Sequence, residues 1–337
     1  MSEIDLGKVE PKIAVKRSRA SAKDMKESEA PAFRSAFFSG FNDFQVYVRT
    51  WDNVDNPKAV VLILHGMVEH GLRYDEFARF LNKNGYVVVV PDERGHGKTA
   101  GAPENVAKYN GDIFADTVQD DIKLADTLIR KYKLPLFVLG HSYGSFRTQS
   151  FIENFHQHTG AVMVGSSCYR KSMQVAFGKL IADIYKTFKG KDAPAKLIEK
   201  VTFNSYGKHF DKRNWLTSDE KIYNEYCRDP YCGKTATAQF YSSFFGNLKK
   251  IYKPSILKQI DTDKPILITS GEEDYVGGKK HKYLDKLAPM YRDLGVQDVE
   301  YKLWYGGRHE LLNETFRNEV FVYIAEWMDN VLKNTKQ

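Results

Sequence analysis

The stretch Gly140–Gly144, with the sequence GHSYG, is the part of the chain that decides the fold. It follows the apolar run Leu134–Leu139 and precedes a segment of helical character that continues through Phe155. Glycines two residues to either side of Ser142 let neighbouring backbone pass close without a Cβ clash. The stretch therefore predicts a sharp, strained turn from a strand into a helix, with the serine at its apex. The simpler alternative is an ordinary turn whose hydroxyl caps the helix.

Apolar runs of strand length alternate with helical stretches on both sides of this turn. The predicted strands are Ala36–Phe38, Phe44–Trp51, Ala59–Leu64, Tyr86–Val90, Leu134–Leu139, Ala161–Val164, Pro265–Thr269 and Val299–Leu303. The predicted helices are Tyr74–Asn84, Asp112–Tyr132, the segment through Phe155, His281–Leu294 and Thr315–Lys333. Continuous apolar strands between helices indicate an α/β fold with a mostly parallel central sheet flanked by helices.

Residues 168–258 interrupt this alternation, because they contain several helical stretches and no comparable strand. We therefore expect a core formed by residues 31–167 and 259–337, with a helical cap over residues 168–258 inserted before the last strands. Residues 1–30 are polar and weakly periodic, which predicts a flexible N-terminal tail.

Composition excludes several classes of protein. The chain has 337 residues, of which 42% are hydrophobic, and no run approaches the roughly 18–20 apolar residues that a membrane-spanning helix needs. The N-terminus is charged from its third residue and lacks an apolar signal segment, so we expect a cytoplasmic protein. Three cysteines in a chain of this length argue against a disulfide framework.

Positive charge is concentrated in the predicted cap. Residues 168–260 hold 18 Lys and Arg against 8 Asp and Glu, although the whole chain carries only +7. Such a surface could meet an anionic membrane peripherally, or it could simply keep a helical surface solvated. No nucleic-acid-binding motif accompanies the charge, so we expect no nucleic acid partner.

A reactive serine needs a base within reach and an acid that orients the base. His309 lies in a glycine-containing loop between the last predicted strand and helix, whereas His281 starts a lysine-rich stretch. After strand Pro265–Thr269, Glu272, Glu273 and Asp274 compete for the acid. Asp274 is favoured because glycines at 271, 277 and 278 frame the loop around it. We therefore expect catalytic residues Ser142, Asp274 and His309.

Negative charge that develops during attack on a carbonyl needs hydrogen-bond donors. The loop that begins at His65 follows strand Ala59–Leu64, where a backbone N–H can reach the serine. Met67 and Tyr143 are therefore the expected oxyanion-hole amides. We interpret His65 as a side chain that holds this loop by hydrogen bonding. The sequence shows no metal-binding motif, so we expect no cofactor and no metal.

Four motifs occur in a fixed order and together resemble one family. They are His65-Gly66-x-x-Glu69-His70-x-x-Arg73-Tyr74, Asp92-x-Arg94-Gly95-His96-Gly97, Gly140-His141-Ser142-x-Gly144 and Arg308-His309-Glu310-Leu311-Leu312-Asn313-Glu314. They closely resemble the monoglyceride lipase and lysophospholipase group of α/β-hydrolases, over about Phe33 to Leu332. The stretch Trp215–Gly233 looks like the cap of bacterial lysophospholipase-like members. Tyr143 departs from the methionine that the family often has there, and we expect it to change the pocket wall.

The resemblance implies an α/β-hydrolase fold, the triad Ser142, Asp274 and His309, an oxyanion hole of Met67 and Tyr143, and a mobile cap that controls entry of an acyl chain. The implied function is a serine carboxylic ester hydrolase that cleaves monoacylglycerols or lysophospholipids, with a single-acyl-chain lipid as its small-molecule substrate. The alternatives are a peptidase or amidase of the same fold, and a non-catalytic ligand receptor.

Aromatic side chains are frequent in the predicted cap, where they could line an acyl tunnel or form the cap's own core. They include Phe177, Tyr185, Phe188, Phe203, Trp215, Phe240, Phe244 and Phe245. We expect most of them in the core and a few in the pocket lining.

Overall fold

The computed structural model describes residues 33–169, 173–201, 203–211 and 214–334. The tail predicted for residues 1–30 lies outside them. All eight predicted strands form, in a single sheet with the order β1-β2-β4-β3-β5-β6-β7-β8. Their bounds are β1 Arg34–Ser39, β2 Gln45–Trp51, β3 Ala59–Leu64, β4 Tyr86–Pro91, β5 Leu136–His141, β6 Gly160–Val164, β7 Ile266–Gly271 and β8 Val299–Trp304.

The central part of the sheet is parallel, as the apolar runs predict. Strand β2 pairs antiparallel with both β1 and β4, and the pairs from β4 through β8 are parallel. All residues of β3, β4 and β5 are buried, because helices cover both faces of these strands. Strand β5 begins at Leu136, after Pro135, which has no N–H to donate to a ladder.

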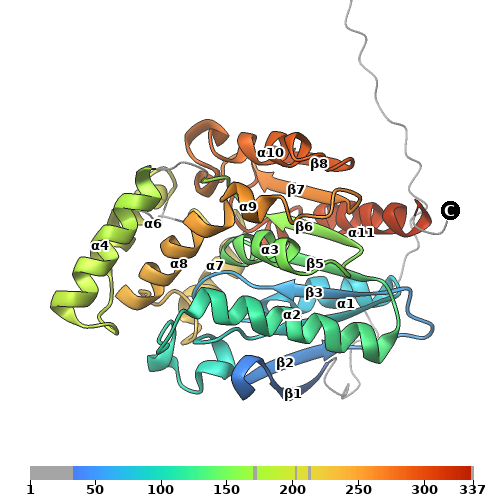
Figure 1. Cartoon of the computed structure of the whole chain (residues 1–337), viewed down its shortest axis with the longest axis horizontal. Helices are drawn as coiled ribbons and strands as arrows, with labels where there is room; N and C mark the ends of the chain where they lie inside the picture. Colours follow the sequence, from blue (N-terminus) through green and yellow to red (C-terminus); the bar gives the residue numbers. More distant parts are fainter. Residues whose placement is uncertain (1–32, 170–172, 202, 212–213, 335–337) are drawn as a thin grey trace, which may run out of the picture. The chain divides into compact units, whose positions relative to one another are not determined.

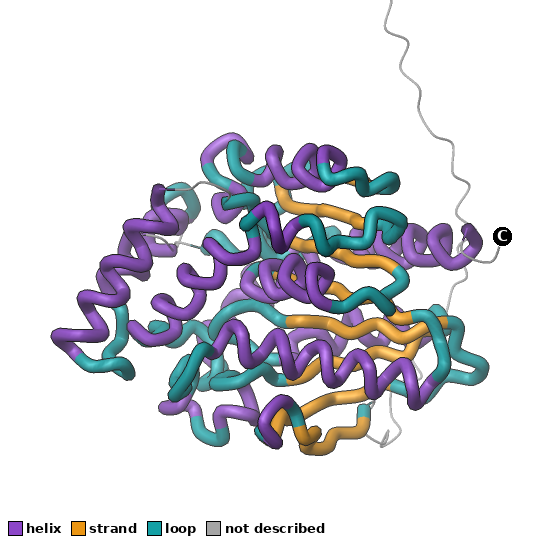
Figure 2. The backbone as a smooth tube through the Cα atoms, in the orientation of Figure 1, coloured by secondary structure: helices purple, strands orange, loops and turns teal. Residues whose placement is uncertain are grey.

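Helices pack on the two faces according to the alternation of strand side chains (Figures 1 and 2). On one face, Val61 and Ile63 share a core with α1 (Asp75–Lys83) and α11 (Arg317–Asn334). On the other face, Leu62 and Leu64 share a core with the helices that cover the sheet there and with helices of the segment between β6 and β7. The helices that cover the sheet there are α2 (Ile113–Tyr132), α3 (Tyr143–Asn154) and α10 (Leu287–Asp293).

The helix predicted over His281–Leu294 is wrong in its first half. Lys280 and His281 have left-handed backbone angles, with φ of 53° and 56°, and residues up to Lys286 form short 3₁₀ turns. Helix α10 begins only at Leu287, two residues before Pro289. Proline is tolerated in a first helical turn and breaks a helix interior, so the helix cannot extend far before it.

The chain between β6 and β7 is helical, as predicted. Its helices are α4 (Met173–Lys189), α5 (Lys196–Val201), α6 (Phe203–Gly207), α7 (Glu220–Arg228), α8 (Ala238–Ile251) and α9 (Pro254–Leu257). Figure 1 shows α4 and α8 side by side, beyond the strand ends from which α3 starts. No described helix combines the length and the apolar composition that crossing a bilayer requires.

Candidate active site

Ser142 occupies the turn between β5 and α3, with φ 53° and ψ −118°. This backbone conformation is costly for a residue with a side chain, and the surroundings hold it in place. The Ser142 N–H donates to the carbonyl of Val164 at 2.9 Å. A Cβ at Gly144 would overlap the carbonyl of Leu64, and one at Gly140 would overlap that of Gly144. The glycines therefore allow the close backbone approach that the GHSYG stretch predicts.

His309 and Asp274 form a buried pair, each only 2% exposed. His309 Nδ1 lies 2.9 Å from Asp274 Oδ2. Asp274 also accepts hydrogen bonds from Ser270 Oγ at 2.9 Å and from the Val276 N–H at 2.8 Å. Burial raises the pKa of Asp274, but His309 and these donors outweigh it and hold the pKa below its usual value. A carboxylate at Nδ1 leaves His309 Nε2 available as an acceptor.

The two competing carboxylates point elsewhere. Glu272 and Glu273 are exposed, and Glu273 Oε2 lies 3.9 Å from the Arg308 guanidinium. Of the three acidic residues in this loop, the structure brings Asp274 to His309.

Two glycines let the histidine loop pack directly on backbone. A Cβ at Gly271 would overlap the carbonyls of Gly307 and Arg308. A Cβ at Gly165, which has φ of 59°, would lie 3.1 Å from His309 Nδ1. Gly271 is visible in the sequence as part of the acid loop. Gly165 was missed, because its role depends on a contact with a residue far away in the chain.

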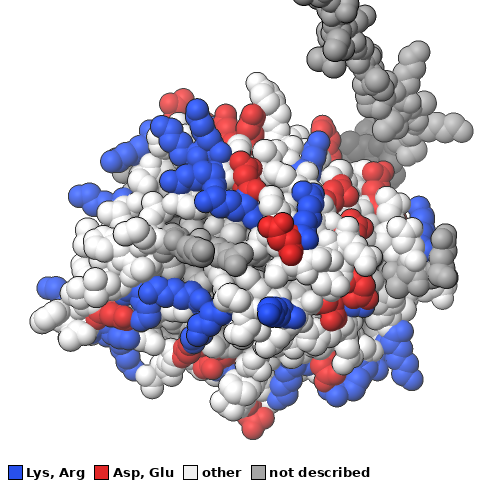
Figure 3. Space-filling view, turned by 45° about the horizontal axis from the view of Figure 1, so that its top comes forward, with Lys and Arg blue, Asp and Glu red and all other residues white. Residues whose placement is uncertain are grey.

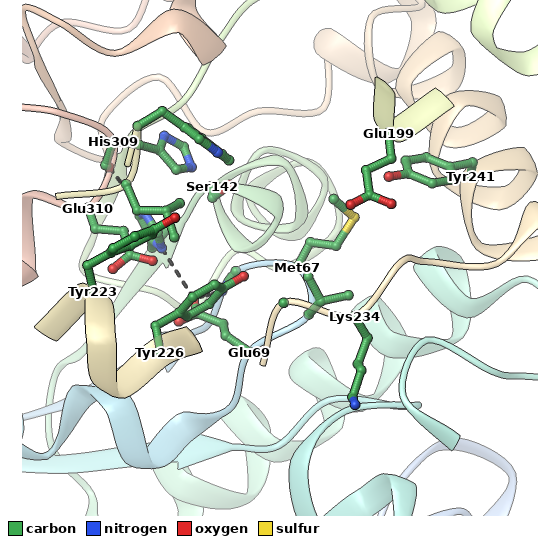
Figure 4. Close-up of a pocket in the computed structure, with 16 residues that line it drawn as sticks. Met67, Glu69, Ser142, Glu199, Tyr223, Tyr226, Lys234, Tyr241, His309 and Glu310 are labelled. Atoms are coloured by element: carbon green, nitrogen blue, oxygen red, sulfur yellow. Dashed lines mark hydrogen bonds and ion pairs between the residues drawn. The ribbon is translucent and has the colours of Figure 1, made fainter. Parts of the chain in front are cut away.

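A pocket brings Ser142 and His309 together with side chains from the loop after β3 and from the inserted helices (Figure 4). Its lining residues are Gly66, Met67, Val68, Glu69, His141, Ser142, Glu199, Trp215, Leu216, Tyr223, Tyr226, Gly233, Lys234, Tyr241, His309 and Glu310. Figure 4 shows Tyr223, Tyr226 and Glu310 on one side of Ser142. Met67, Glu199, Tyr241 and Lys234 lie on the other side.

The two residues predicted to supply oxyanion amides lie in the neighbourhood of the pocket: Tyr143 follows Ser142 in the chain, and Met67 lines the same pocket as Ser142. Tyr143 is the first residue of α3, so its N–H belongs to the helix terminus and has no intrahelical acceptor. Met67 lines the pocket from the loop after β3, which contacts the turn through Gly144. The Tyr143 ring does not change the pocket wall as expected. It is buried against Phe114, Phe240 and Phe244, with ring centroids 5.0–5.6 Å away.

His65 holds the loop after β3, as interpreted from the sequence. Its Nδ1 lies 2.7 Å from the Gly66 carbonyl, and its Nε2 accepts from the Glu93 N–H at 3.1 Å. Burial lowers the pKa of His65 well below its usual value, which favours the neutral ring that this pair of contacts requires. Both ring nitrogens are therefore used within the protein.

A buried polar network beside the pocket was missed by the sequence reasoning. Arg73 binds both oxygens of Glu310, at 2.8 and 2.6 Å, and also pairs with Glu69. Glu69 Oε1 accepts from the Gly66 N–H at 2.5 Å and from the Tyr74 hydroxyl at 2.8 Å. The network thus connects the loop after β3 with the histidine loop. Its members stand in the quoted motifs, but their spacing does not reveal that they meet.

His141 joins this network to the serine turn. Its Nδ1 lies 3.0 Å from the Tyr74 hydroxyl and 3.3 Å from Glu69 Oε1, and its Nε2 lies 3.2 Å from the His309 carbonyl. Burial lowers the pKa of His141, but Glu69 outweighs it and raises the pKa above its usual value. A protonated His141 can donate to both the Glu69 carboxylate and the His309 carbonyl.

The aromatic residues of the inserted segment divide into three groups. Phe240, Phe244 and Phe245 pack in the core, as expected for most of them. Trp215 lines the pocket and lies 4.9 Å from the His309 ring. Phe177 and Phe188 are 64% and 79% exposed, so the expectation of core or lining is wrong for both. The Phe203 side chain lies outside the described part of the chain.

Comparisons with known proteins agree with this geometry. A family model described as serine aminopeptidase, S33 (Hydrolase_4), matches residues 55–316. A monoglyceride lipase homolog of monkeypox virus is 28% identical over 305 residues, which cover 89% of this chain and 99% of the viral protein.

Two solved structures share the fold. A carboxyl esterase of Bacillus coagulans superposes with a TM-score of 0.79 at 22% identity, covering 90% of this chain and 100% of the esterase. A monoglyceride lipase variant of Saccharomyces cerevisiae, solved with a substrate analogue, superposes with a TM-score of 0.70 at 21% identity. That match covers 91% of this chain and 97% of the yeast chain. The protein is therefore an α/β-hydrolase of the Hydrolase_4 family and a monoglyceride lipase-like enzyme.

Proposed function

We propose that the protein hydrolyses single-chain lipid esters, with monoacylglycerol as the principal substrate, through an acyl-enzyme on Ser142. The observation that carries the proposal is the strained Ser142 turn, which shares a pocket with His309, the hydrogen-bond partner of Asp274. The monoglyceride lipase names among the similar proteins support the choice of ester.

In the proposed mechanism, His309 Nε2 takes the Ser142 proton as Oγ attacks the ester carbonyl. The Met67 and Tyr143 N–H groups donate to the resulting oxyanion. His309 then protonates the leaving alcohol, which departs and leaves the acyl group on Ser142. A water molecule, deprotonated by His309, attacks the acyl-enzyme and releases the fatty acid.

The side of the pocket next to His309 suits a polar alcohol. Tyr223, Tyr226, Glu69 and Glu310 line it and offer hydroxyl and carboxylate groups (Figure 4). A glycerol leaving group needs such hydrogen-bond partners when it is taken out of water. This arrangement supports monoacylglycerol over an ester whose alcohol part is apolar.

The family description also names aminopeptidases, which must hold the α-ammonium group of a peptide. A carboxylate can do so only if its charge is not already neutralised. Two of the pocket carboxylates, Glu69 and Glu310, are both paired with Arg73. The pairing of these two carboxylates supports an ester substrate over a peptide, and Glu199 is the remaining carboxylate of the pocket lining.

A substrate panel tests this proposal. The purified protein is assayed with monoacylglycerol, lysophosphatidylcholine, a short soluble ester and an aminoacyl anilide, each beside Ser142→Ala. We expect glycerol release from monoacylglycerol, lost in the variant. Hydrolysis of the anilide alone would replace the ester proposal with an aminopeptidase. Hydrolysis of the short ester alone would leave an esterase without a lipid substrate.

We also propose that the protein contacts anionic membranes through α4. Apolar residues along one side of this helix are exposed to solvent, with exposed fractions from 47% to 86%. They are Met173, Phe177, Leu180, Ile184 and Phe188. Their spacing is that of a single apolar stripe, and interfacial helices combine such a stripe with nearby positive charge. Figure 3 shows Lys and Arg side chains above and below an uncharged area at the left, where α4 lies in Figure 1.

Vesicle binding tests the membrane contact. The double variant Phe177→Asp, Phe188→Asp should lose cosedimentation with phosphatidylserine vesicles and keep its activity on a dispersed short ester. Tyr305→Asp is the matched control, since Tyr305 is 90% exposed and lies outside α4. Equal binding by all three proteins would contradict the proposal. A cytoplasmic location with peripheral attachment stays a prediction, which cell fractionation can check.

A further inference from the structure

His70, Asp229 and Cys232 form a cluster of potential metal ligands beside the pocket, although His70 is far from the other two in the sequence. One ring nitrogen of His70, one carboxylate oxygen of Asp229 and the sulfur of Cys232 all lie within 4.8 Å of one another. His70 belongs to the loop after β3, whereas Asp229 and Cys232 follow α7. None of the three takes part in the ester chemistry proposed for Ser142.

Polar groups in the cluster are buried without being fully paired. His70 is 7% exposed and Cys232 is 6% exposed. His70 Nε2 lies 2.8 Å from Asp229 Oδ2, but within the described residues His70 Nδ1 is buried with no hydrogen-bond partner. Nδ1 faces away from Asp229, so the ring presents Nε2 to the cluster, and an ion bound there would replace the contact between Nε2 and Asp229 Oδ2.

The backbone around the cluster holds the donors in place. The Tyr231 N–H donates to Asp229 Oδ1 at 2.8 Å, which leaves Oδ2 directed at His70. The Cys232 N–H donates to the Asp229 carbonyl at 3.1 Å. The Gly233 N–H donates to the Val68 carbonyl at 3.0 Å, which attaches this segment to the loop that carries His70. The Asp229 side chain is 31% exposed and opens the cluster to solvent.

We propose that His70, Asp229 and Cys232 bind Zn²⁺. Imidazole, carboxylate and thiolate are the donors that zinc takes in proteins, at about 2.0–2.2 Å for nitrogen and oxygen and about 2.3 Å for sulfur. A hard ion such as Mg²⁺ or Ca²⁺ would prefer oxygen donors throughout. Three protein ligands leave a fourth position for water. Binding releases the thiol proton to solvent, so a thiolate and a carboxylate balance the charge of the ion.

The donor atoms must rearrange to bind the ion, because the 2.8 Å between His70 Nε2 and Asp229 Oδ2 is too short for two ligands of one ion. A tetrahedral zinc site with these bond lengths sets its donors roughly 3.2–3.6 Å apart. A pair of donor atoms at the 4.8 Å limit would have to approach by about 1 Å, and rotation of the side chains can supply this movement. The bound ion would join the loop after β3 to the segment after α7, the two segments that supply Val68 and Gly233 to the pocket lining.

Metal titration tests the site on the full chain. Co²⁺ serves as the spectroscopic probe, because thiolate coordination gives it a charge-transfer band in the near ultraviolet. Zn²⁺ then displaces Co²⁺ and is quantified by competition with a chromogenic chelator. We expect one ion per chain and a thiolate band. Loss of the Cys232 ligand should weaken Zn²⁺ binding by about 100-fold or more, as should loss of His70.

The chain offers a matched control. Cys227 is exposed and lies five residues before Cys232, so Cys227→Ser should bind Zn²⁺ like the unmodified protein. Cys232→Ser and His70→Ala should show no charge-transfer band with Co²⁺ and should no longer compete with the chelator for Zn²⁺. Circular dichroism checks that both variants fold. If either does not fold, Asp229→Asn replaces it. Stoichiometric binding that survives the loss of Cys232, or no binding by the unmodified chain, would overturn the site.

Discussion

Asp274 and His309 show how a single contact defines the role of each residue. His309 Nδ1 meets Asp274 Oδ2 at 2.9 Å in a buried environment, so the carboxylate holds the ring in one tautomer. The residue type alone could not decide among three neighbouring carboxylates. The fold decides, because Asp274 alone of the three turns inward to the histidine loop.

Asp274→Asn should lower kcat by about 10³–10⁴-fold, because an amide can favour the wrong histidine tautomer. The substitution keeps the shape of the side chain, so KM should change much less. Kinetics on a soluble ester measure both constants. Glu273→Gln is the matched control, since Glu273 is exposed, and it should leave kcat within about twofold. If kcat fell less in Asp274→Asn than in Glu273→Gln, Asp274 would not be the acid that orients His309.

Asp274 should also make the folded state sensitive to acid. Its pKa is lower in the folded protein than in the unfolded chain, although burial by itself raises it. The resulting stability is fully present above the unfolded pKa of about 3.9 and is lost as the pH falls toward the folded value. Urea unfolding can be measured from about pH 6 down to about pH 3. Over this range the free energy of unfolding should fall less steeply with pH in Asp274→Asn than in the unmodified chain. Parallel pH profiles for the two proteins would contradict this assignment of the pKa shift.

At the scale of elements, Arg73 ties together segments that the chain keeps far apart. It binds Glu69, four residues before it, and Glu310, 237 residues after it, and all three side chains are at most 10% exposed. The loop after β3 and the histidine loop therefore share one buried cation. A buried charge that loses its partner is costly, because desolvation is no longer offset by an opposite charge.

Arg73→Met should reduce the free energy of unfolding by about 3–5 kcal/mol, since it removes the guanidinium with which both buried carboxylates pair. Arg79→Met is the matched control, because Arg79 also pairs with a carboxylate four residues before it, Asp75, but on an exposed surface. Exposed pairs contribute about 0–1 kcal/mol. Chemical denaturation compares the two variants. Equal losses would mean that the Arg73 network contributes no more than a surface ion pair.

The elements themselves could be predicted where local pattern determines them. Apolar runs such as Ala59–Leu64 correctly predicted the strands that are buried on both faces, which need continuous apolar residues, and alternation correctly predicted the more exposed β1 and β2. The helix over His281–Leu294 was not predicted correctly, because the left-handed residues Lys280 and His281 carry no helix-breaking side chain.

The polar network of Glu69, Arg73, His141 and Glu310 could not be predicted either, because its members meet only after the sheet has formed. The exposed stripe on α4 was also missed, since an apolar helical pattern does not show whether a partner covers it.

At the scale of the whole molecule, the sheet brings the serine turn, the acid loop and the histidine loop to the same end of its parallel strands. β5, β7 and β8 each end next to one of the three proposed catalytic residues. The segment between β6 and β7 then adds Glu199, Trp215 and Tyr241 to the pocket wall. We therefore expect this architecture to activate Ser142 as a nucleophile.

Labelling with a fluorophosphonate probe tests that claim most directly, because the probe bonds covalently to an activated serine. Peptide mass spectrometry of the labelled protein should place one adduct on Ser142. The adduct should disappear in Ser142→Ala and after prior incubation with a monoacylglycerol analogue. The neighbouring substitution Ser145→Ala should keep it. A protein that stays unlabelled while correctly folded, or an adduct that persists in Ser142→Ala, would contradict the account.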